Sequence, residues 1–301
     1  MTHTSKTIVF FGTDEFSAVS LRQLISSGAT IGAVITKPDS RKGRGRELQP
    51  SIVKQIALEH GIPVWQPARM AELDGPLTDL RDSQADGIIG VLVSFGKIIP
   101  QSIIDMFEPG IINVHPSLLP VYRGPSPIET AIYDGDAETG VTIMQLSDQM
   151  DAGPIYTQQT YPLNGTETAP ELENILAALG GQQLLAALPA IISGELSPAA
   201  QNDSEASYCS LLRKQDSLLD PSSVTAAQAE RRVRAYLAYP KTKVTIAGHS
   251  IVITKAHVSN RSESVLDVQC SDSHYLCIDE LIGPSGRAMN AKAFLNGYAA
   301  G

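Results

Sequence analysis

The first part of the chain alternates continuous apolar runs with amphipathic stretches. Such runs are typical of strands that are covered on both faces of a parallel sheet. Three of them are expected to be buried strands: Thr7–Phe11, Ile31–Thr36 and Gly87–Val93. The apolar residues of 15–27 recur at helical spacing, and Gly28 marks the end of that predicted helix. Strands that alternate with helices in this way predict an α/β domain with a doubly wound, mostly parallel sheet of Rossmann-like type.

The pattern continues to about residue 200. Further strands are expected to begin at Ile111 and to occupy Gly140–Leu146 and Ile155–Tyr161. Residues 170–193 predict a long apolar helix with a kink or break at the Gly180–Gly181 pair, because glycine weakens a helix interior.

The hydrophobic period changes in the last third of the chain. Short alternating strands follow one another there, with a hairpin expected around Gly248. Short strands separated by turns predict a smaller β-barrel domain of OB-like type. We therefore expect a catalytic domain at 1–200, a linker at 201–206 and a C-terminal domain at 207–301.

Composition narrows the class of protein. The 301 residues are 43% hydrophobic, and no run of about 18 apolar residues predicts a membrane span. The polar start, Met1–Lys6, and the short apolar run behind it do not predict a signal peptide. The cysteines have no metal-type spacing and are odd in number, which favours free thiols in a reducing cytoplasm: Cys209, Cys270 and Cys277.

Charge is distributed unevenly along the chain. The net charge is −9, yet 207–301 holds 11 basic and 8 acidic residues. A basic C-terminal region behind an acidic body suggests a polyanionic partner, although chance variation on solvated surfaces would give the same counts.

A polar loop is predicted at 37–50. Two glycines and a high density of positive charge suit contact with phosphate groups, whereas the alternative is an ordinary solvated loop. Four residues are the candidates for nucleic-acid contact: Arg41, Lys42, Arg44 and Arg46.

Candidate chemistry gathers where the strand that begins at Ile111 ends. Asn113 and His115 are two residues apart, so on a strand their side chains point to the same face. An amide can hold an oxyanion, and an imidazole can exchange protons near neutral pH. A carboxylate beside His115 would come from Asp151, with Asp148 as a competitor. The alternative is that both residues simply form a turn.

Three other kinds of site receive little support. The first strand is not followed by Gly-x-Gly-x-x-Gly, and the chain lacks the Gly-x-Ser-x-Gly elbow of α/β hydrolases. His115 and Asp151 could bind a metal ion, but no third ligand has an obvious spacing.

The stretch Asn113-Val-His-Pro-Ser-Leu-Leu-Pro120, with the later Asp151-Ala-Gly153, resembles the folate-dependent formyltransferases. The early Phe11-Gly-Thr-Asp-Glu-Phe16, the basic loop and Gly286-Arg-Ala-Met289 extend the resemblance to nearly the whole chain. It implies formyl transfer from 10-formyltetrahydrofolate, without a metal. The basic loop and the full-length layout further imply that the acceptor is methionyl initiator tRNA.

The resemblance also implies residue roles. Asn113, His115 and Asp151 match the catalytic trio of the family, with Asn113 and a protonated His115 stabilising the oxyanion and Asp151 favouring the charged imidazole. The folate site matches one segment: Ser117, Leu118, Leu119 and Pro120. A cytoplasmic monomer without membrane association is expected.

Two alternatives remain at this stage. The acceptor would be a sugar-nucleotide amine in a related enzyme, or the chain would be an RNA-binding module on an inactive scaffold. The C-terminal region departs from the family pattern at Leu211, Pro221 and Leu237–Pro240, and these departures concern the contact with RNA and not the formyl-transfer residues.

Overall fold

The computed structural model describes residues 6–42, 47–246 and 248–298. The chain forms two compact units. The first comprises 1–123, 140–161 and 174–208, and the second comprises 124–139, 162–173 and 209–301. The domain limits expected from the sequence stay a prediction.

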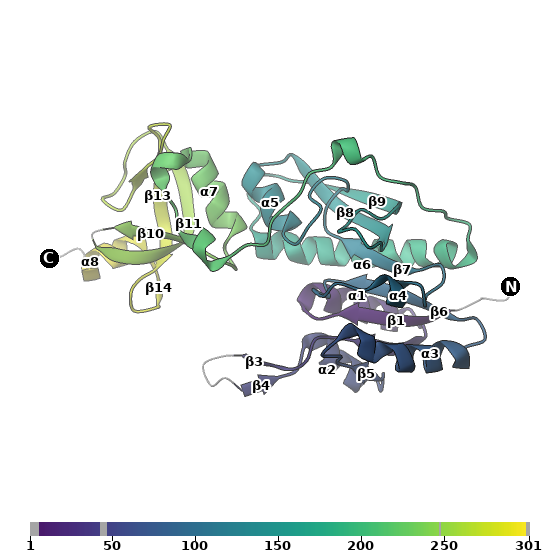
Figure 1. Ribbon diagram of the computed structural model, residues 1–301. Coiled ribbons are helices and arrows are strands. Elements are labelled where there is room, and N and C mark those ends of the chain that lie inside the picture. Colours follow the sequence, from purple (N-terminus) through teal and green to yellow (C-terminus); the bar gives the residue numbers. More distant parts are fainter. Residues whose placement is uncertain (1–5, 43–46, 247, 299–301) are drawn as a thin grey trace. The chain divides into compact units, whose positions relative to one another are not determined.

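The first unit is built on a seven-stranded sheet in the order β5-β2-β1-β6-β7-β8-β9 (Figure 1). The strands are β1 (Thr7–Gly12), β2 (Ile31–Ile35), β5 (Val64–Trp65), β6 (Ile88–Val93), β7 (Ile111–His115), β8 (Glu138–Gln145) and β9 (Ile155–Pro162). From β5 to β7 the pairing is parallel, and β8 runs antiparallel to β7. This confirms the predicted Rossmann-like, mostly parallel sheet. The strand order reverses between β1 and β6, where sheets of this kind open a crevice.

Helices flank this sheet as the sequence pattern requires. They are α1 (Glu15–Ser26), α2 (Ile52–Glu59), α3 (Asp74–Ser83), α4 (Gln101–Ile104) and α6 (Ala169–Ser193), with a 3-10 turn η1 (Met70–Leu73). Asp14 caps α1 by accepting a hydrogen bond from the Ser17 backbone at 3.1 Å. Val9 and Phe11 of β1 share one apolar cluster with residues of α3 and α4. These alternate residues of β1 therefore face the layer that holds α3 and α4.

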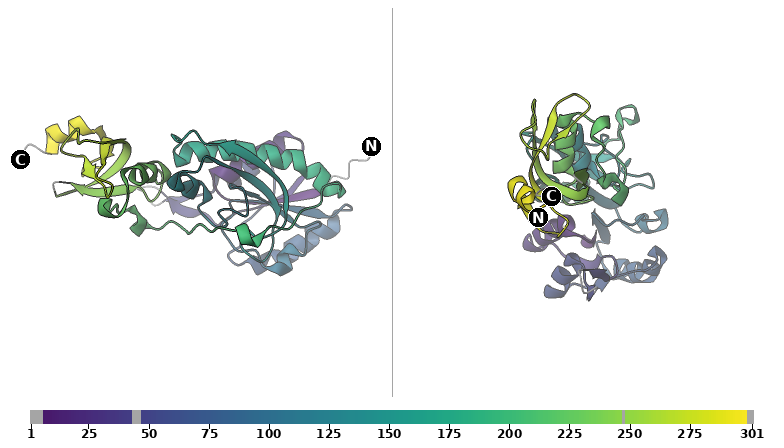
Figure 2. Two further views of the ribbon diagram at one scale, coloured as in Figure 1. Left: turned by 90° about the horizontal axis from the view of Figure 1, so that it is seen from above. Right: turned by 90° about the vertical axis from the view of Figure 1, so that its left-hand side faces the viewer.

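Helix α6 runs unbroken through Gly180 and Gly181, so the predicted kink or break is wrong (Figure 1, Figure 2). A Cβ atom at Gly180 would lie 2.7 Å from the Val114 side chain, so the glycine is there for close packing on the sheet. The helix is long and apolar enough to cross a membrane, and 44% of its most apolar window is buried inside the protein. A helix that buries much of its surface against a sheet is also long and apolar, so this composition does not by itself indicate a membrane span.

The basic loop is partly regular. β3 (Ser40–Lys42) and β4 (Glu47–Gln49) pair as an antiparallel hairpin within the region expected to be a loop. Arg41 lies opposite Leu48 in this pairing. The short, highly polar strands carry little of the apolar alternation by which a strand is recognised in a sequence.

The second unit contains α5 (Pro127–Asp134) and a five-stranded antiparallel sheet. The sheet follows the order β10-β11-β13-β12, with β14 beside β13. Its elements are α7 (Ala226–Ala235), β10 (Thr242–Ile246), β11 (His249–Ser259), β12 (Val268–Gln269), β13 (Tyr275–Ile282), β14 (Ala288–Asn290) and α8 (Ala291–Tyr298), and the preceding segment holds 3-10 turns η2 (Asp203–Glu205), η3 (Lys214–Ser217) and η4 (Pro221–Ser223). The hairpin expected around Gly248 is confirmed, because β10 and β11 pair on either side of it.

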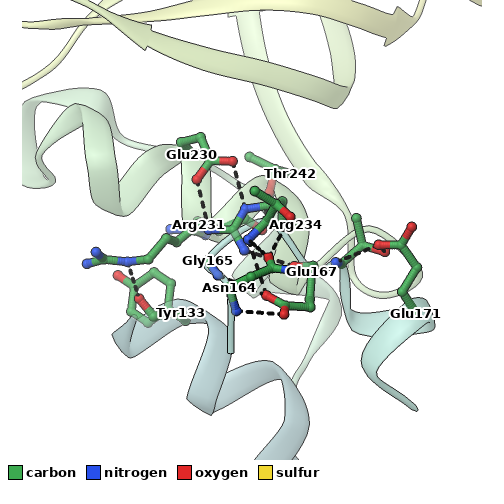
Figure 3. A network of polar contacts seen from close by, with 12 residues as sticks. Tyr133, Asn164, Gly165, Glu167, Glu171, Glu230, Arg231, Arg234 and Thr242 are labelled. Atoms are coloured by element: carbon green, nitrogen blue, oxygen red, sulfur yellow. Dashed lines mark hydrogen bonds and ion pairs between the residues drawn. The ribbon is translucent and has the colours of Figure 1, made fainter. Parts of the chain in front are cut away.

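A polar network joins α7 to two earlier segments, through residues that lie 67 and 98 positions apart in the sequence (Figure 3). The Arg231 guanidinium donates to the Tyr133 carbonyl at the end of α5, at 2.9 Å. Arg234 donates to the Glu167 carbonyl at 2.8 Å and pairs with Glu230 at 2.7 Å. The second unit is therefore assembled from three separate stretches of sequence.

Candidate active site

Strand β7 presents different residues to its two faces. Val114 packs against Gly180 of α6, whereas Asn113 and His115 point to the opposite face. Both side chains are buried, each with a relative exposure of 5%. Within the residues that the structure describes, the Asn113 amide has no side-chain hydrogen bond to the protein. Because a buried amide normally finds a partner, this one is free to serve a bound carbonyl group.

Both ring nitrogens of His115 face an oxygen atom of the protein. Its Nε2 lies 3.0 Å from the Tyr122 carbonyl oxygen, and its Nδ1 lies 3.7 Å from Oδ1 of Asp151. A carbonyl oxygen can only accept, so Nε2 carries a hydrogen and Nδ1 is the nitrogen that exchanges its proton. The Nδ1–Oδ1 distance exceeds that of a hydrogen bond, so the two groups interact mainly through charge when the ring is protonated.

The structure places Asp151, and not Asp148, beside His115. Asp148 is exposed at the start of the same loop. Asp151 has a positive φ of 50°, in the left-handed region that aspartate tolerates better than most residues. Gly153 follows, where any Cβ atom would clash with the Gln145 carbonyl oxygen. The Asp-x-Gly spacing therefore has a steric cause.

Gln201 fastens the loop that carries Asp151. Its side-chain amide donates to the carbonyls of Asp151 and Gly153, at 2.8 and 2.7 Å. Its carbonyl oxygen accepts from two guanidinium nitrogens of Arg123, at 3.0 and 2.8 Å. One side chain thus connects the Asp151 loop to the arginine that follows Tyr122.

Arg123 is a buried charge with partners. Only 2% of the residue is exposed, and its guanidinium also pairs with Asp203 at 2.7 Å and contacts the Tyr208 hydroxyl at 3.3 Å. Burial opposes the charge, but the hydrogen bonds to Asp203 and Tyr208 raise the pKa of the guanidinium above its usual value. Arg123 therefore stays charged and fixes the backbone next to Tyr122.

The segment predicted to line the folate site is anchored by two side chains from β8 and β9. Thr142 donates to the Ser117 carbonyl at 2.6 Å and accepts from the Leu119 backbone at 3.1 Å. Gln158 donates to the Leu119 carbonyl at 2.8 Å. Ser117 is 1% exposed and Leu119 is 3% exposed, whereas Leu118 and Pro120 are half-buried. The segment consequently has a fixed shape.

The carboxyl ends of β1 and β6 meet at the point where the strand order reverses. Ser94, which follows β6, donates a short hydrogen bond to the carboxylate of Asp14. Thr13 donates to the Phe95 carbonyl at 3.3 Å. This places the Gly-Thr-Asp turn and the Ser-Phe-Gly turn at the edge of the sheet where ligands of doubly wound proteins bind.

Of the four basic candidates, the structure describes Arg41 and the backbone of Lys42, which belong to the β3–β4 hairpin. Arg41 is exposed on β3, and of Lys42 the structure describes only the backbone. Arg44 and Arg46 lie outside the described residues. The base of this hairpin is fixed by Lys54, whose ammonium lies 2.8 Å from Asp39. Hydrogen bonds from Lys54 and then Gln66 hold the pKa of the Asp39 carboxyl below its usual value.

The arrangement suits transfer of an acyl group. It combines an available amide donor, an imidazole with one nitrogen ready to exchange a proton, and a carboxylate beside that nitrogen. The sequence did not indicate Tyr122, Thr142 and Gln201. Tyr122 acts through its own backbone carbonyl, and the other two bind backbone carbonyls, so residue types do not reveal these contacts. Among the described residues, no third His, Cys, Asp or Glu joins His115 and Asp151 in a metal-ligand group.

Known proteins are similar to this chain along almost its whole length. The family model "Formyl transferase" matches residues 5–188, and "Formyl transferase, C-terminal domain" matches 211–299. The methionyl-tRNA formyltransferase of Methylococcus capsulatus is 38% identical over 303 residues, covering 97% of each chain. The methionyl-tRNA formyltransferase of Pseudoalteromonas translucida is also 38% identical, covering 96% of this chain and 93% of its own.

Solved structures share the fold at lower identity. The N-formyltransferase of Helicobacter canadensis, in complex with folinic acid and dTDP-3-aminofucose, is 20% identical with a TM-score of 0.68. It covers 91% of this chain and 98% of its own. HypX from Aquifex aeolicus, in complex with tetrahydrofolic acid, is 15% identical with a TM-score of 0.67, covering 99% of this chain and 48% of its own.

Proposed function

Because the chain belongs to the formyl transferase family, we propose that it transfers a formyl group from 10-formyltetrahydrofolate to the α-amine of methionyl initiator tRNA. One observation carries the chemistry: His115 lies between the Tyr122 carbonyl and Asp151, with the Asn113 amide available on the same strand face. Full-length similarity to methionyl-tRNA formyltransferases supports the acceptor. The activity belongs to translation in the cytoplasm.

The first step joins the amine to the formyl carbon. The neutral amine attacks, a C–N bond forms, and the formyl oxygen becomes an oxyanion. Asn113 donates its amide hydrogen to that oxygen, and a protonated His115 adds positive charge nearby. Preorganised hydrogen-bond donors in a buried site stabilise the oxyanion of the transition state, and this is usually the largest single contribution to catalysis of acyl transfer.

The second step moves protons and expels the donor. The ammonium that forms on attack must lose a proton, and N10 of the folate must gain one as its bond to the formyl carbon breaks. Nδ1 of His115 is the ring nitrogen that faces Asp151, so it is the one that exchanges these protons. The Asp151 carboxylate stabilises the imidazolium during this exchange.

The donor is expected along the rigid segment that Thr142 and Gln158 anchor. Ser117–Pro120 leads directly out of β7, so a folate beside it has its formyl group near Asn113 and His115. The solved relatives named above hold folinic acid and tetrahydrofolic acid, which supports a folate co-substrate. This scheme involves the protein's own residues at every proton transfer and does not call for a metal ion.

The acceptor's phosphates require positive charge outside the reaction centre. Arg41, Lys42, Arg44 and Arg46 supply it in the hairpin region, and the C-terminal region adds its own basic excess. At the positions that depart from the family pattern, Leu211 and Tyr239 are 66% and 53% exposed, whereas Pro221 is half-buried. These departures concern how the C-terminal region contacts RNA and leave the formyl-transfer residues unchanged.

The proposal is tested by an assay with 10-formyltetrahydrofolate and three acceptors. These are charged initiator methionyl-tRNA, uncharged initiator tRNA and a dTDP-linked amino sugar, with the His115→Ala variant as the negative control. Transfer to the charged tRNA alone supports the proposal. Transfer to the sugar nucleotide would support the second candidate, which solved relatives at about 20% identity suggest and full-length relatives at 38% do not.

A further inference from the structure

Three side chains of types that can ligate a metal ion lie close together in the second unit, in and beside the C-terminal sheet. His257 of β11 stands directly opposite Cys277 of β13 in the antiparallel register. The segment after β11 brings Glu263 over the same sheet face. The three potential ligand atoms lie within 4.8 Å of one another.

Cys277 is buried on the outer face of its strand. Its neighbours Leu276 and Ile278 belong to the hydrophobic core of the unit, so Cys277 points away from that core. It is nevertheless only 2% exposed, because the segment after β11 covers it: its thiol lies 3.9 Å from the Arg261 carbonyl. The thiol is therefore covered by the segment that follows β11 and contacts a backbone carbonyl of that segment.

The distances suit tetrahedral coordination. Nε2 of His257 lies 3.4 Å from Oε2 of Glu263. Two ligand atoms, each about 2.1 Å from a tetrahedral zinc ion, stand roughly 3.4 Å apart. The Cys277 sulfur has only to close the remaining gap, so small side-chain adjustments complete a three-ligand set.

A fourth residue orients the histidine. Nδ1 of His257 lies 3.0 Å from the Asp279 carboxylate, which keeps the hydrogen on Nδ1 and leaves Nε2 to bind the ion. Metal-bound histidines usually donate their other ring N–H to a carboxylate or carbonyl in this manner. Asp279 lies two residues after Cys277 on β13, so the strand period supplies both from one face.

We propose that His257, Glu263 and Cys277 form a binding site for a single divalent transition metal ion, with Zn²⁺ as the expected ion and water as the fourth ligand. One imidazole, one carboxylate and one thiolate form a ligand set that zinc accepts and that Mg²⁺ and Ca²⁺, which prefer oxygen ligands, do not. The site is distinct from the reaction centre, and the proposed function does not depend on it.

Binding has a defined chemistry. The Cys277 thiol loses its proton to solvent as the sulfur–metal bond forms, and no electron is transferred. Burial, together with the carboxylates of Asp267 and Glu263, raises the pKa of this thiol to about 11, so the ion displaces a proton. The bound ion ties Glu263 to β11 and β13, and so fixes the segment that covers Cys277.

The test uses the full-length protein, kept reduced, freed of metal with a chelator and then titrated with Zn²⁺. We expect one ion per chain and a rise in the melting temperature on binding. Titration with Co²⁺ should give the near-ultraviolet absorption of a thiolate–cobalt bond. Cys277→Ser, His257→Gln and Glu263→Gln should each weaken binding at least about tenfold.

His274→Gln is the matched control. His274 also pairs with an aspartate in the same unit, with its Nδ1 3.4 Å from Asp272, but among the described residues it belongs to no group of three potential metal ligands. Binding that is unchanged in His274→Gln and lost in the other variants supports the site. Absence of stoichiometric binding, or full affinity in Cys277→Ser, overturns it. Glu263 and His257 are about half exposed, so their variants are expected to fold even if Cys277→Ser does not.

Discussion

Gln201→Glu separates the two contacts that Gln201 makes. The new carboxylate keeps an acceptor for Arg123 but has no hydrogen to donate to the carbonyls of Asp151 and Gly153. Instead it places negative charge beside both carbonyl oxygens. The Asp151 loop should therefore move away, while the buried guanidinium retains its partners.

The size of the effect follows from the two bonds that are lost. Each neutral hydrogen bond contributes about 0.5–1.5 kcal/mol, so the loop conformation that holds Asp151 at His115 loses about 1–3 kcal/mol. If catalysis requires that conformation, kcat should fall about 5- to 150-fold. The melting temperature should fall by no more than about 2–4 °C for each kcal/mol of this loss, because the Arg123 pairing survives.

The assay is formyl transfer at saturating concentrations of both substrates, with the melting temperature measured in parallel. Asn202→Asp is the control, since it makes the same chemical change one residue further on. The Asn202 side-chain oxygen accepts hydrogen bonds from the Ser204 backbone and hydroxyl, at 3.2 and 2.7 Å. An aspartate at this position keeps both bonds. A Gln201→Glu enzyme with kcat within twofold of the unchanged protein would refute the idea that Gln201 positions Asp151.

Three further predictions concern other charges. Asp151→Asn should lower kcat about 10²-fold or more and alter the pH–rate profile, whereas Asp148→Asn should not; equal effects would contradict the pairing with His115. Replacing Arg41, Lys42, Arg44 and Arg46 together by glutamine should weaken tRNA binding. The slope of log affinity against log salt concentration should become shallower by up to about 3, and an unchanged slope would exclude phosphate contacts by these residues. Burial raises the pKa of Glu129, so its charged form destabilises the fold as pH rises through that pKa. Glu129→Gln should raise the melting temperature at pH 7 but not at pH 3, whereas exposed Glu138→Gln should have no effect at either pH.

Much of the fold follows from local pattern. Buried parallel strands are read directly from apolar runs, and β1, β6 and β7 lie within a residue or so of their expected places. The long helix shows the limit of this reasoning. Gly180 weakens a helix in isolation, but its lack of a side chain is what allows α6 to approach Val114. Propensity cannot anticipate a contact made with a strand 66 residues earlier in the chain.

The site divides in the same way. Asn113 and His115 can be found from sequence because two residues of spacing on a strand fix a shared face. Gln201 cannot, because it reaches Asp151 from 50 residues away and acts on backbone atoms. His257 and Cys277 are likewise brought together by antiparallel register, so the spacing of cysteines along the chain gives no sign of them.

The network around α7 affects how the protein could be divided. Cleavage in 201–206 would leave an N-terminal fragment that keeps Tyr133 and Glu167 but lacks the arginines bound to their carbonyls (Figure 3). It would also uncover the Tyr133 ring, which stacks on Tyr236 of the C-terminal fragment, with ring centres 6.2 Å apart. Neither fragment would be a self-contained folding unit, so the two pieces should recover stability only when expressed together. A chimaera joined at 201–206 would therefore fold only if its C-terminal part supplied equivalents of Arg231, Arg234 and Tyr236.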